Sequence, residues 1–435
     1  MKFLRAGAVY ALANITSAAV PFVLLPLLTR VLGPAEYAQV VGFALLVTLC
    51  QTVAGLNAHA ALGVVWFQRP RDAIPAFTGT ALALALASTL LVAGVAVLLL
   101  WLAPGVGGGI SPAWGAVAAL TAGANVVVQC RLVLWQSQQR PLHSAALQIA
   151  TSVINVALSL LAVLVFSWGG DGRNAGIAAS MLLIAALAVL LFRRAGELHW
   201  APDRTQLITL MTFGLPLIVH TLAGVLLGAA DRWSVSILLD AHAFGIYGAG
   251  AQLGMVMGVL ADAFVKAYSP WIYGKLSSGR PEDRHCVVGA VYVAMPAFLG
   301  AAALVWGALQ ATSALLLGPQ YWAAATVLPW FVLGGAFSGI YMCTSGLYFF
   351  AGRTSLLAKV TLSSALIGST TTWFLVGTLG VVGAAMGYAF TQGVLALITS
   401  VVAIRSFDLP WSEPAKALIL WSRGAFGSTT QHSAP

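Results

Sequence analysis

The chain has 435 residues, of which 60% are hydrophobic and only 8% are charged. No class of soluble globular protein has this composition, so it predicts a polytopic membrane protein. The formal net charge of +9 would suggest nucleic-acid binding in a soluble protein. In a membrane protein, basic residues at the cytoplasmic ends of the spans explain this positive charge better. We therefore expect no nucleic-acid partner.

The first apolar segment, residues 6–29, is long enough to cross a hydrocarbon core of about 30 Å. It contains Asn14, Pro21 and Pro26, which a helix serving only as an anchor would avoid. Proline leaves backbone carbonyl groups unpaired, and inside a bilayer these must bond to protein or water. We therefore expect this helix to face a packed bundle or a wet cavity.

Twelve apolar segments are predicted to span the membrane. They cover residues 6–29, 38–63, 76–101, 113–135, 143–167, 174–192, 207–230, 244–271, 286–309, 322–350, 354–376 and 382–404. With a cytoplasmic N-terminus, eighteen of the 21 Lys and Arg residues fall at cytoplasmic ends or loops. The three exceptions are Arg30, Arg173 and Arg232. This asymmetry predicts that both termini are cytoplasmic.

The second half of the chain repeats features of the first at an offset of 207 residues. Gly7 aligns with Gly214 near the start of each half, and Gly176 aligns with Gly383 near the end. One offset that serves both ends of a half suggests a duplication. Because each half holds an even number of spans, the two repeats are expected to be parallel.

The predicted fold class is therefore an all-α polytopic membrane protein. Twelve transmembrane helices form two parallel six-helix repeats around a central cavity, with both termini in the cytoplasm. The predicted domains are residues 1–200 and 201–410, one six-helix bundle each, followed by a cytoplasmic tail over residues 411–435.

The first candidate site residues lie at proline interruptions of corresponding spans. His220 follows Pro216 in the seventh span, and Asn14 lies at the matching depth of the first span. Interrupted helices at equivalent places in two halves point to a substrate site. The alternative is that His220 is neutral and forms a hydrogen bond with a neighbouring helix.

Two further spans carry polar side chains. Asp262 and Lys266 are four residues apart on the eighth span, so they share a helix face and can pair. They are either a structural ion pair or a cation tuned by a carboxylate at the mouth of a cavity. On the fourth span, Asn125 and Gln129 lie near one face with Arg131 beside it, and this stripe should face protein or water. The alternative for Arg131 is that it reaches lipid phosphates.

Arg30 and Arg232 lie on the side of the membrane where basic residues are rare, which makes them more informative than the cytoplasmic arginines. Arg232 directly follows Asp231, whereas the acid closest to Arg30 in sequence is Glu36. They are candidates for binding an anionic substrate. The alternative is that they cap the outer ends of helices.

The sequence contains no arrangement of residues that indicates an enzyme. It has no HExxH motif, no phosphate-binding loop and no paired carboxylates outside the membrane. The spacing of the four cysteines matches no metal site. We therefore expect a transporter that needs no cofactor and no metal, and the sequence leaves coupling to a proton or sodium gradient open.

Five stretches, in three regions of the chain, resemble a known family of transporters. PFVLLPLLTRVLGPAEYA resembles the opening of Wzx-type O-antigen and exopolysaccharide flippases, and its turn from Leu32 to Tyr37 is the most specific motif. FGLPLIVHTLAGVLLGAADRW followed by FGIYGAGAQLG is similar to the seventh and eighth helices of that family. AGRTSLLAKVTLSSALIGS and LGVVGAAMGYAFTQ are similar to its eleventh and twelfth. The family belongs to the multidrug/oligosaccharidyl-lipid/polysaccharide flippase superfamily. One departure is Ala38, where the family usually has glycine.

The resemblance implies a function in the synthesis of O-antigen, capsule or exopolysaccharide. An oligosaccharide linked to undecaprenyl pyrophosphate is moved from the inner to the outer leaflet of the bacterial inner membrane by alternating access. A polysaccharide polymerase and a chain-length regulator are the implied partners. A cationic cavity would hold the pyrophosphate. The substrate-binding candidates are Asn14, Arg30, Asn125, Gln129, Arg131, His220, Arg232, Asp262 and Lys266.

Two alternatives remain. The first is a multidrug or organic-cation exporter of the same superfamily, whose substrates would favour carboxylates inside the membrane. The second is a membrane-embedded polysaccharide polymerase, an enzyme that would need a large outer loop. The sequence offers essentially one intramembrane carboxylate, Asp262, and no outer connection long enough for a domain.

Overall fold

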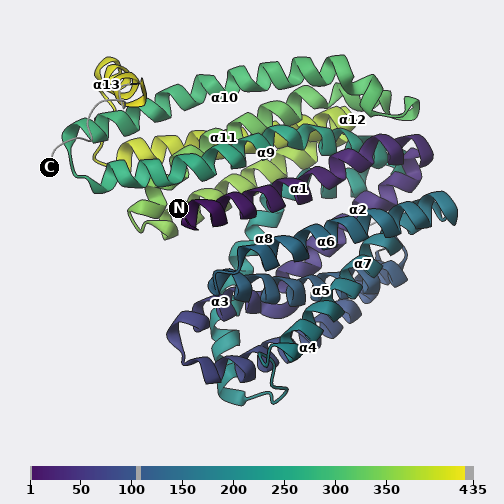
Figure 1. Ribbon diagram of the computed structural model, residues 1–435. Coiled ribbons are helices and arrows are strands. Elements are labelled where there is room, and N and C mark those ends of the chain that lie inside the picture. Colours follow the sequence, from purple (N-terminus) through teal and green to yellow (C-terminus); the bar gives the residue numbers. More distant parts are fainter. Residues whose placement is uncertain (1, 104–108, 427–435) are drawn as a thin grey trace. The chain divides into compact units, whose positions relative to one another are not determined.

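The computed structural model describes residues 2–103 and 109–426, and all regular structure within these ranges is helical (Figure 1). The side chains of residues 2–15, 18, 219–220, 267 and 423–426 lie outside the description. Two predicted site side chains, those of Asn14 and His220, fall in these gaps.

Thirteen α-helices are described, and they are joined by four short helical segments labelled η. The α-helices are α1 (Lys2–Val31), α2 (Pro34–Val53), α3 (Ala58–Gln68), α4 (Ile74–Leu102), α5 (Pro112–Ser137), α6 (Pro141–Leu160), α7 (Gly169–Arg194), α8 (Arg204–Leu238), α9 (Ala241–Ser277), α10 (Pro281–Leu316), α11 (Leu328–Phe350), α12 (Thr354–Ser406) and α13 (Pro414–Phe426). The short segments are η1 (Ala54–Asn57), η2 (Arg71–Ala73), η3 (Leu161–Val165) and η4 (Pro319–Thr326).

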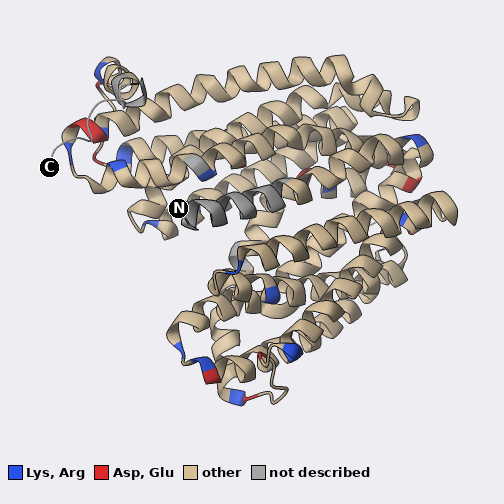
Figure 2. Ribbon diagram, in the orientation of Figure 1, with Lys and Arg blue, Asp and Glu red and all other residues tan. Residues whose placement is uncertain are grey.

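The lengths and apolar surfaces of these helices confirm the predicted class, an all-α polytopic membrane protein. Ten helical segments in the described ranges are long and apolar enough to cross a membrane. In addition, α1 contributes a shorter apolar stretch, Ala19–Val31, and α12 is divided by a kink at Gly380, where φ is +60°. Charged residues gather at helix ends and in loops, and long stretches of helix carry none (Figure 2). The count of twelve spans and the cytoplasmic location of both termini stay predictions.

Contacts divide the chain into two compact units, which we describe separately. The first unit contains Met1–Ala249 and Leu315–Trp322, and the second contains Gly250–Ala314 and Ala323–Pro435. The boundary predicted near residue 200 separates two duplicated halves of the sequence, whereas these units are defined by contacts. That boundary stays a prediction.

Small residues allow the helices of the first unit to pack closely. A side chain at Gly123 of α5 would collide with Thr89 of α4, and one at Gly176 of α7 would collide with Ser159 of α6. Apolar helices have no hydrophobic driving force toward one another in lipid, so close approach of their backbones supplies much of the attraction.

The predicted turn at Gly33 and Pro34 is present and begins α2. Pro34 occupies the first turn of the helix, where its missing N–H is not needed. The backbone N–H of Gly33 donates to Oε2 of Glu36 at 3.0 Å, which closes the turn. The Tyr321 hydroxyl donates to the carbonyl of Leu32 at 3.0 Å. Burial raises the pKa of Tyr321, so this hydroxyl stays protonated and available as a donor.

In the second unit, α13 docks on α10. Ala417 of α13 packs against Gly289, where a larger side chain would collide with it. His285 Nε2 lies 3.1 Å from Oε2 of Glu413, and hydrogen bonds from Lys416 and His285 lower the pKa of Glu413. The tail predicted over residues 411–435 therefore includes a packed helix.

The predicted orientation can be tested with reporter fusions. Alkaline phosphatase, which is active only outside the cytoplasm, should be inactive when fused after Arg194 or Arg353 and active when fused after Trp168. The reason is the excess of basic residues at one set of helix ends. A cytoplasmic reporter such as β-galactosidase should give the opposite pattern. The reverse result at any of the three positions would contradict both termini being cytoplasmic.

Candidate functional site

The polar stripe predicted on the fourth span forms part of a hydrogen-bonded ladder in the first unit. Asn125 of α5 donates to Oε1 of Gln51 on α2 at 3.1 Å. Gln129, one turn further, donates to Oδ1 of Asn125 at 3.3 Å. All three side chains are half-buried. Gln51 was missed by the sequence analysis, although a glutamine within an apolar segment was a signal for it.

The second predicted span, residues 38–63, is interrupted. Between α2 and α3, the three residues Gly55, Leu56 and Asn57 have φ values of +72°, +47° and +55°. Glycine adopts this left-handed conformation freely, whereas leucine and asparagine are strained in it by roughly 1–2 kcal/mol each. The hydroxyl of Ser88 on α4 accepts a hydrogen bond from the freed N–H of Gly55 at 2.8 Å.

Arg131 is buried in the first unit, with 2% of its surface exposed. Its guanidinium pairs with the carboxylate of Glu197 and lies over the rings of Trp135 and Phe192, at 4.2 and 4.7 Å. Glu197 also accepts a hydrogen bond from Gln138 at 2.5 Å. The interpretation that Arg131 reaches lipid phosphates is wrong, because the segment after α7 folds back over the end of α5 and supplies the counterion.

That segment, residues 195–203, is fixed along the end of α4. The N–H of His199 donates to the carbonyl of Pro75 at 2.9 Å, and the N–H of Asp203 donates to Thr80 at 3.2 Å. Gly79 leaves room for the carbonyl of His199. The connection between the predicted halves is therefore a fitted part of the first unit.

The predicted pair on the eighth span is confirmed in the second unit. Nζ of Lys266 lies 2.6 Å from a carboxylate oxygen of Asp262, and both side chains are more than half exposed. An exposed pair of this kind adds only about 0.3–0.5 kcal/mol to stability. The ammonium group is therefore within reach of an anion that approaches this face of α9.

The two arginines predicted on the sparsely charged side both bond to helix carbonyl groups. Arg30 donates to the carbonyl of Leu315, near the end of α10, at 2.7 Å. Arg232 donates to the carbonyl of Gly228 at 2.9 Å. Beside it, Asp231 is buried and accepts a hydrogen bond from Tyr247 of α9 at 2.6 Å. Arg30 thus caps a helix end, as its alternative interpretation proposed.

Arg173 is a buried cation that the sequence analysis placed in an outer connection. Because α7 begins at Gly169, this residue lies in its second turn, 8% exposed. Its guanidinium donates to Asn155 at 2.7 Å and to Ser159. Among the residues that the structure describes, no carboxylate pairs with it. The burial of Arg173 could not be predicted from the sequence, because nothing there indicated that the helix begins at two glycines.

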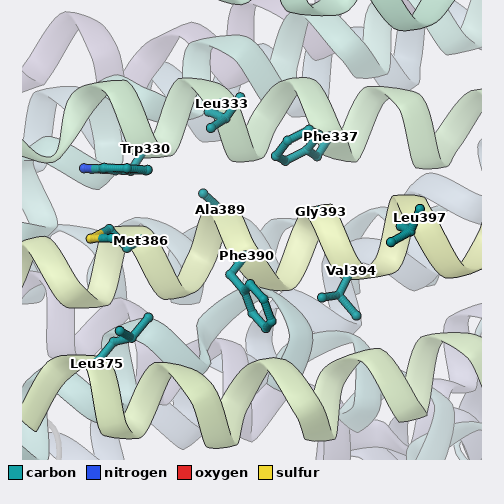
Figure 3. A pocket seen from close by; sticks show the side chains of 10 residues that line it. All are labelled: Trp330, Leu333, Phe337, Leu375, Met386, Ala389, Phe390, Gly393, Val394 and Leu397. Atoms are coloured by element: carbon teal, nitrogen blue, oxygen red, sulfur yellow. The ribbon is translucent and has the colours of Figure 1, made fainter.

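The second unit contains an apolar pocket of about 510 Å³. Figure 3 shows its lining on three neighbouring helical segments: α11, the part of α12 before Gly380 and the part after it. The lining residues are Trp330, Leu333, Phe337, Leu375, Met386, Ala389, Phe390, Gly393, Val394 and Leu397. Such a wall can contact hydrocarbon but offers almost no group for hydrogen bonding.

Residues 3–273 match the family described as "Polysaccharide biosynthesis protein". The chain belongs to this family. Two relatives of the chain come from Haemophilus influenzae. One, "Lsg locus putative protein 1", is 22% identical over 84% of the chain and 90% of its own length. The other, an "Uncharacterized membrane protein", is 22% identical over 64% and 67%.

Two solved structures share the fold of this chain. An inward-facing multidrug resistance MATE family transporter of the MOP superfamily superposes with a TM-score of 0.72 at 14% identity, covering 89% of this chain and 94% of that one. The lipid II flippase MurJ, in an inward closed conformation, superposes with a TM-score of 0.68 at 12% identity, covering 97% and 93%. The chain therefore has the fold of these two structures.

Proposed function

We propose that the chain is a flippase that moves an oligosaccharide linked to undecaprenyl pyrophosphate from the inner to the outer leaflet of the bacterial inner membrane. The observation that carries the proposal is the match of residues 3–273 to the polysaccharide biosynthesis family, on a fold shared with a lipid II flippase. In this proposal the chain works by alternating access. It receives the lipid-linked unit from the enzymes that build it and delivers the unit to a polymerase and a chain-length regulator.

Each chemical part of this substrate has side chains in one of the two units that could bind it. A pyrophosphate head attracts cations, and Lys266 presents an exposed ammonium group. Sugars form hydrogen bonds with neutral amides, which Asn125 and Gln129 supply in the first unit. A polyprenyl chain is pure hydrocarbon, and the pocket between α11 and α12 is lined by apolar groups.

A multidrug exporter of the same superfamily is the competing proposal, and the fold comparisons do not separate the two. An organic cation would bind best to a carboxylate that has no cation beside it. Asp262 already pairs with Lys266, and the buried Asp231 accepts the hydroxyl of Tyr247. These two partners favour the flippase.

Transport by the purified protein in liposomes tests the proposal. The wild-type protein should move a fluorescent undecaprenyl-pyrophosphate oligosaccharide across the bilayer, measured as the fraction quenched by a membrane-impermeant reductant. K266A should slow this movement at least about 10-fold, because a charge-assisted bond to phosphate is lost. Its unfolding temperature should stay close to wild type, since the lost ion pair is exposed.

K359A is the matched control, because Lys359 is an exposed lysine on another helix of the second unit, α12. It should transport like the wild type. Movement of an organic cation but not of the lipid would instead establish the exporter. Adding a sodium or proton gradient in the same assay tests whether transport is coupled to either ion.

A further inference from the structure

The interruption of the second span is surrounded by polar side chains. Gln51 precedes it, Asn57 is its last residue and His59 follows it. From α5, Asn125 bonds to Gln51 and Gln129 bonds to Asn125. All five side chains are half-buried, whereas the backbone between them is covered: Ala54, Gly55, Leu56 and Ala58 are all buried. The polar groups therefore reach the surface of the first unit while the break itself is packed.

The packing of α3 on α5 places His59 in line with this ladder. A side chain at Gly55 would collide with Val126, and one at Gly63 would collide with Val133. His59 lies midway between the two glycines, and Gln129 lies midway between the two valines. The polar side chains of the broken span and of α5 thus follow one seam.

Two polar atoms in this seam are buried and unsatisfied. Nδ2 of Asn57 and Nδ1 of His59 have no hydrogen-bond partner among the residues that the structure describes. A buried polar atom without a partner costs about 1–3 kcal/mol, and Leu56 and Asn57 add backbone strain. Unsatisfied polar atoms and strained backbone are typical of sites where a ligand or a conformational change relieves them.

The location excludes lipid as that partner. Residues 34–68 form one of the segments apolar and long enough to span the membrane. Half-exposed carboxamides in such a segment cannot face hydrocarbon without losing their hydrogen bonds, so they face protein or a water-filled path. The carbonyl of Leu56 is covered by Gly214 of α8, which leaves the side chains of the seam, not its backbone, available to a ligand.

The chemistry of the seam selects a neutral polar ligand. Four of its five side chains are uncharged carboxamides, each with donors and an acceptor, and the fifth is an imidazole. None is a carboxylate, an ammonium or a guanidinium. Hydroxyl and acetamido groups match such a surface, whereas a phosphate would be better held by charged donors.

We propose that Gln51, Asn57, His59, Asn125 and Gln129 form the subsite for sugar residues, separate from the groups that hold the pyrophosphate. This inference rests on the proposed function, since it assigns the oligosaccharide head to the broken second span. Asn57 and His59 contact the sugar with the exposed parts of their half-buried side chains, and Gln51, Asn125 and Gln129 hold the seam in register.

Binding of two lipids that differ only in their sugars tests the assignment. The full-length protein in nanodiscs is titrated with undecaprenyl pyrophosphate carrying the oligosaccharide, and with undecaprenyl pyrophosphate alone. N57G removes the amide at a position whose positive φ suits glycine, and H59F keeps the ring shape without the nitrogens. Each should weaken binding of the sugar-bearing lipid about 10-fold and leave binding of the sugar-free lipid unchanged.

T48V is the control on the same span, because the exposed hydroxyl of Thr48 bonds, among the described residues, only to the carbonyl of Ala44 within its own helix. Equal loss of affinity for both lipids, or a large fall in unfolding temperature, would show a structural role and overturn the inference. Unchanged affinity for both would overturn it too. If the wild-type protein binds neither lipid, the proposed function itself fails.

Discussion

Replacing Arg131 with alanine is expected to lower the free energy of unfolding by about 3–5 kcal/mol, because the change strands the carboxylate of Glu197 in a mostly covered position. The guanidinium also covers the rings of Trp135 and Phe192, and that contact area is lost with it. The measurement is thermal or denaturant unfolding of the purified protein in detergent, together with the yield of folded protein from membranes.

The double variant R131M/E197Q provides the matched comparison. It removes both charges and keeps similar volumes, so it should recover most of the stability that R131A loses. R131K should recover less, because lysine keeps the charge but cannot stack on two rings. If R131A unfolded like the wild type yet failed to transport, the buried ion pair would not be its main role. The sequence prediction of a substrate-binding cation would then be favoured.

The class of fold could be predicted from the sequence because it depends on composition alone. Long apolar segments with few charges must become helices in a bilayer, since no water is there to bond the backbone. The pairing of Asp262 with Lys266 could be predicted for a similar reason, because the helix repeat fixes which side chains share a face. Local rules were sufficient in both cases.

The partners of Arg131 and Arg173 could not be predicted, because they depend on tertiary contacts. Glu197 reaches Arg131 only because the segment after α7 folds back on the first unit. Arg173 is buried because α7 begins four residues before it and packs on α6. A count of basic residues treats both arginines as topology signals and says nothing of their depth.

The break in the second span was missed for a different reason. Hydropathy averages over about nineteen residues, so a three-residue interruption inside an apolar segment leaves the average high. The letters GLNAH carried the information: a glycine and, two residues later, an asparagine, which is one of the few other residues that tolerate a positive φ. Glycine and asparagine within an apolar span can therefore mark a discontinuous helix.

Replacing Gly245 with leucine is expected to destabilise the first unit by about 3 kcal/mol, because the new side chain would have to occupy the position of a backbone carbonyl. A Cβ atom at Gly245, in the second turn of α9, would collide with the carbonyl of Pro34 at the start of α2. Backbone cannot move aside as a flexible side chain can. The measurement is the unfolding temperature of the purified protein.

G274L is the control on the same helix, since a side chain at Gly274 would meet nothing within 4 Å among the described residues. It should be neutral or slightly stabilising, because leucine favours a helix over glycine by up to about 1 kcal/mol. At the offset of 207 residues, Gly245 aligns with Ala38, which is fully buried. There is therefore room for the methyl group of Ala38 in the first half, whereas there is no room for a methyl group at Gly245 in the second half. Equal stability of G245L and G274L would show that α9 and the turn at Pro34 are not held in this close contact.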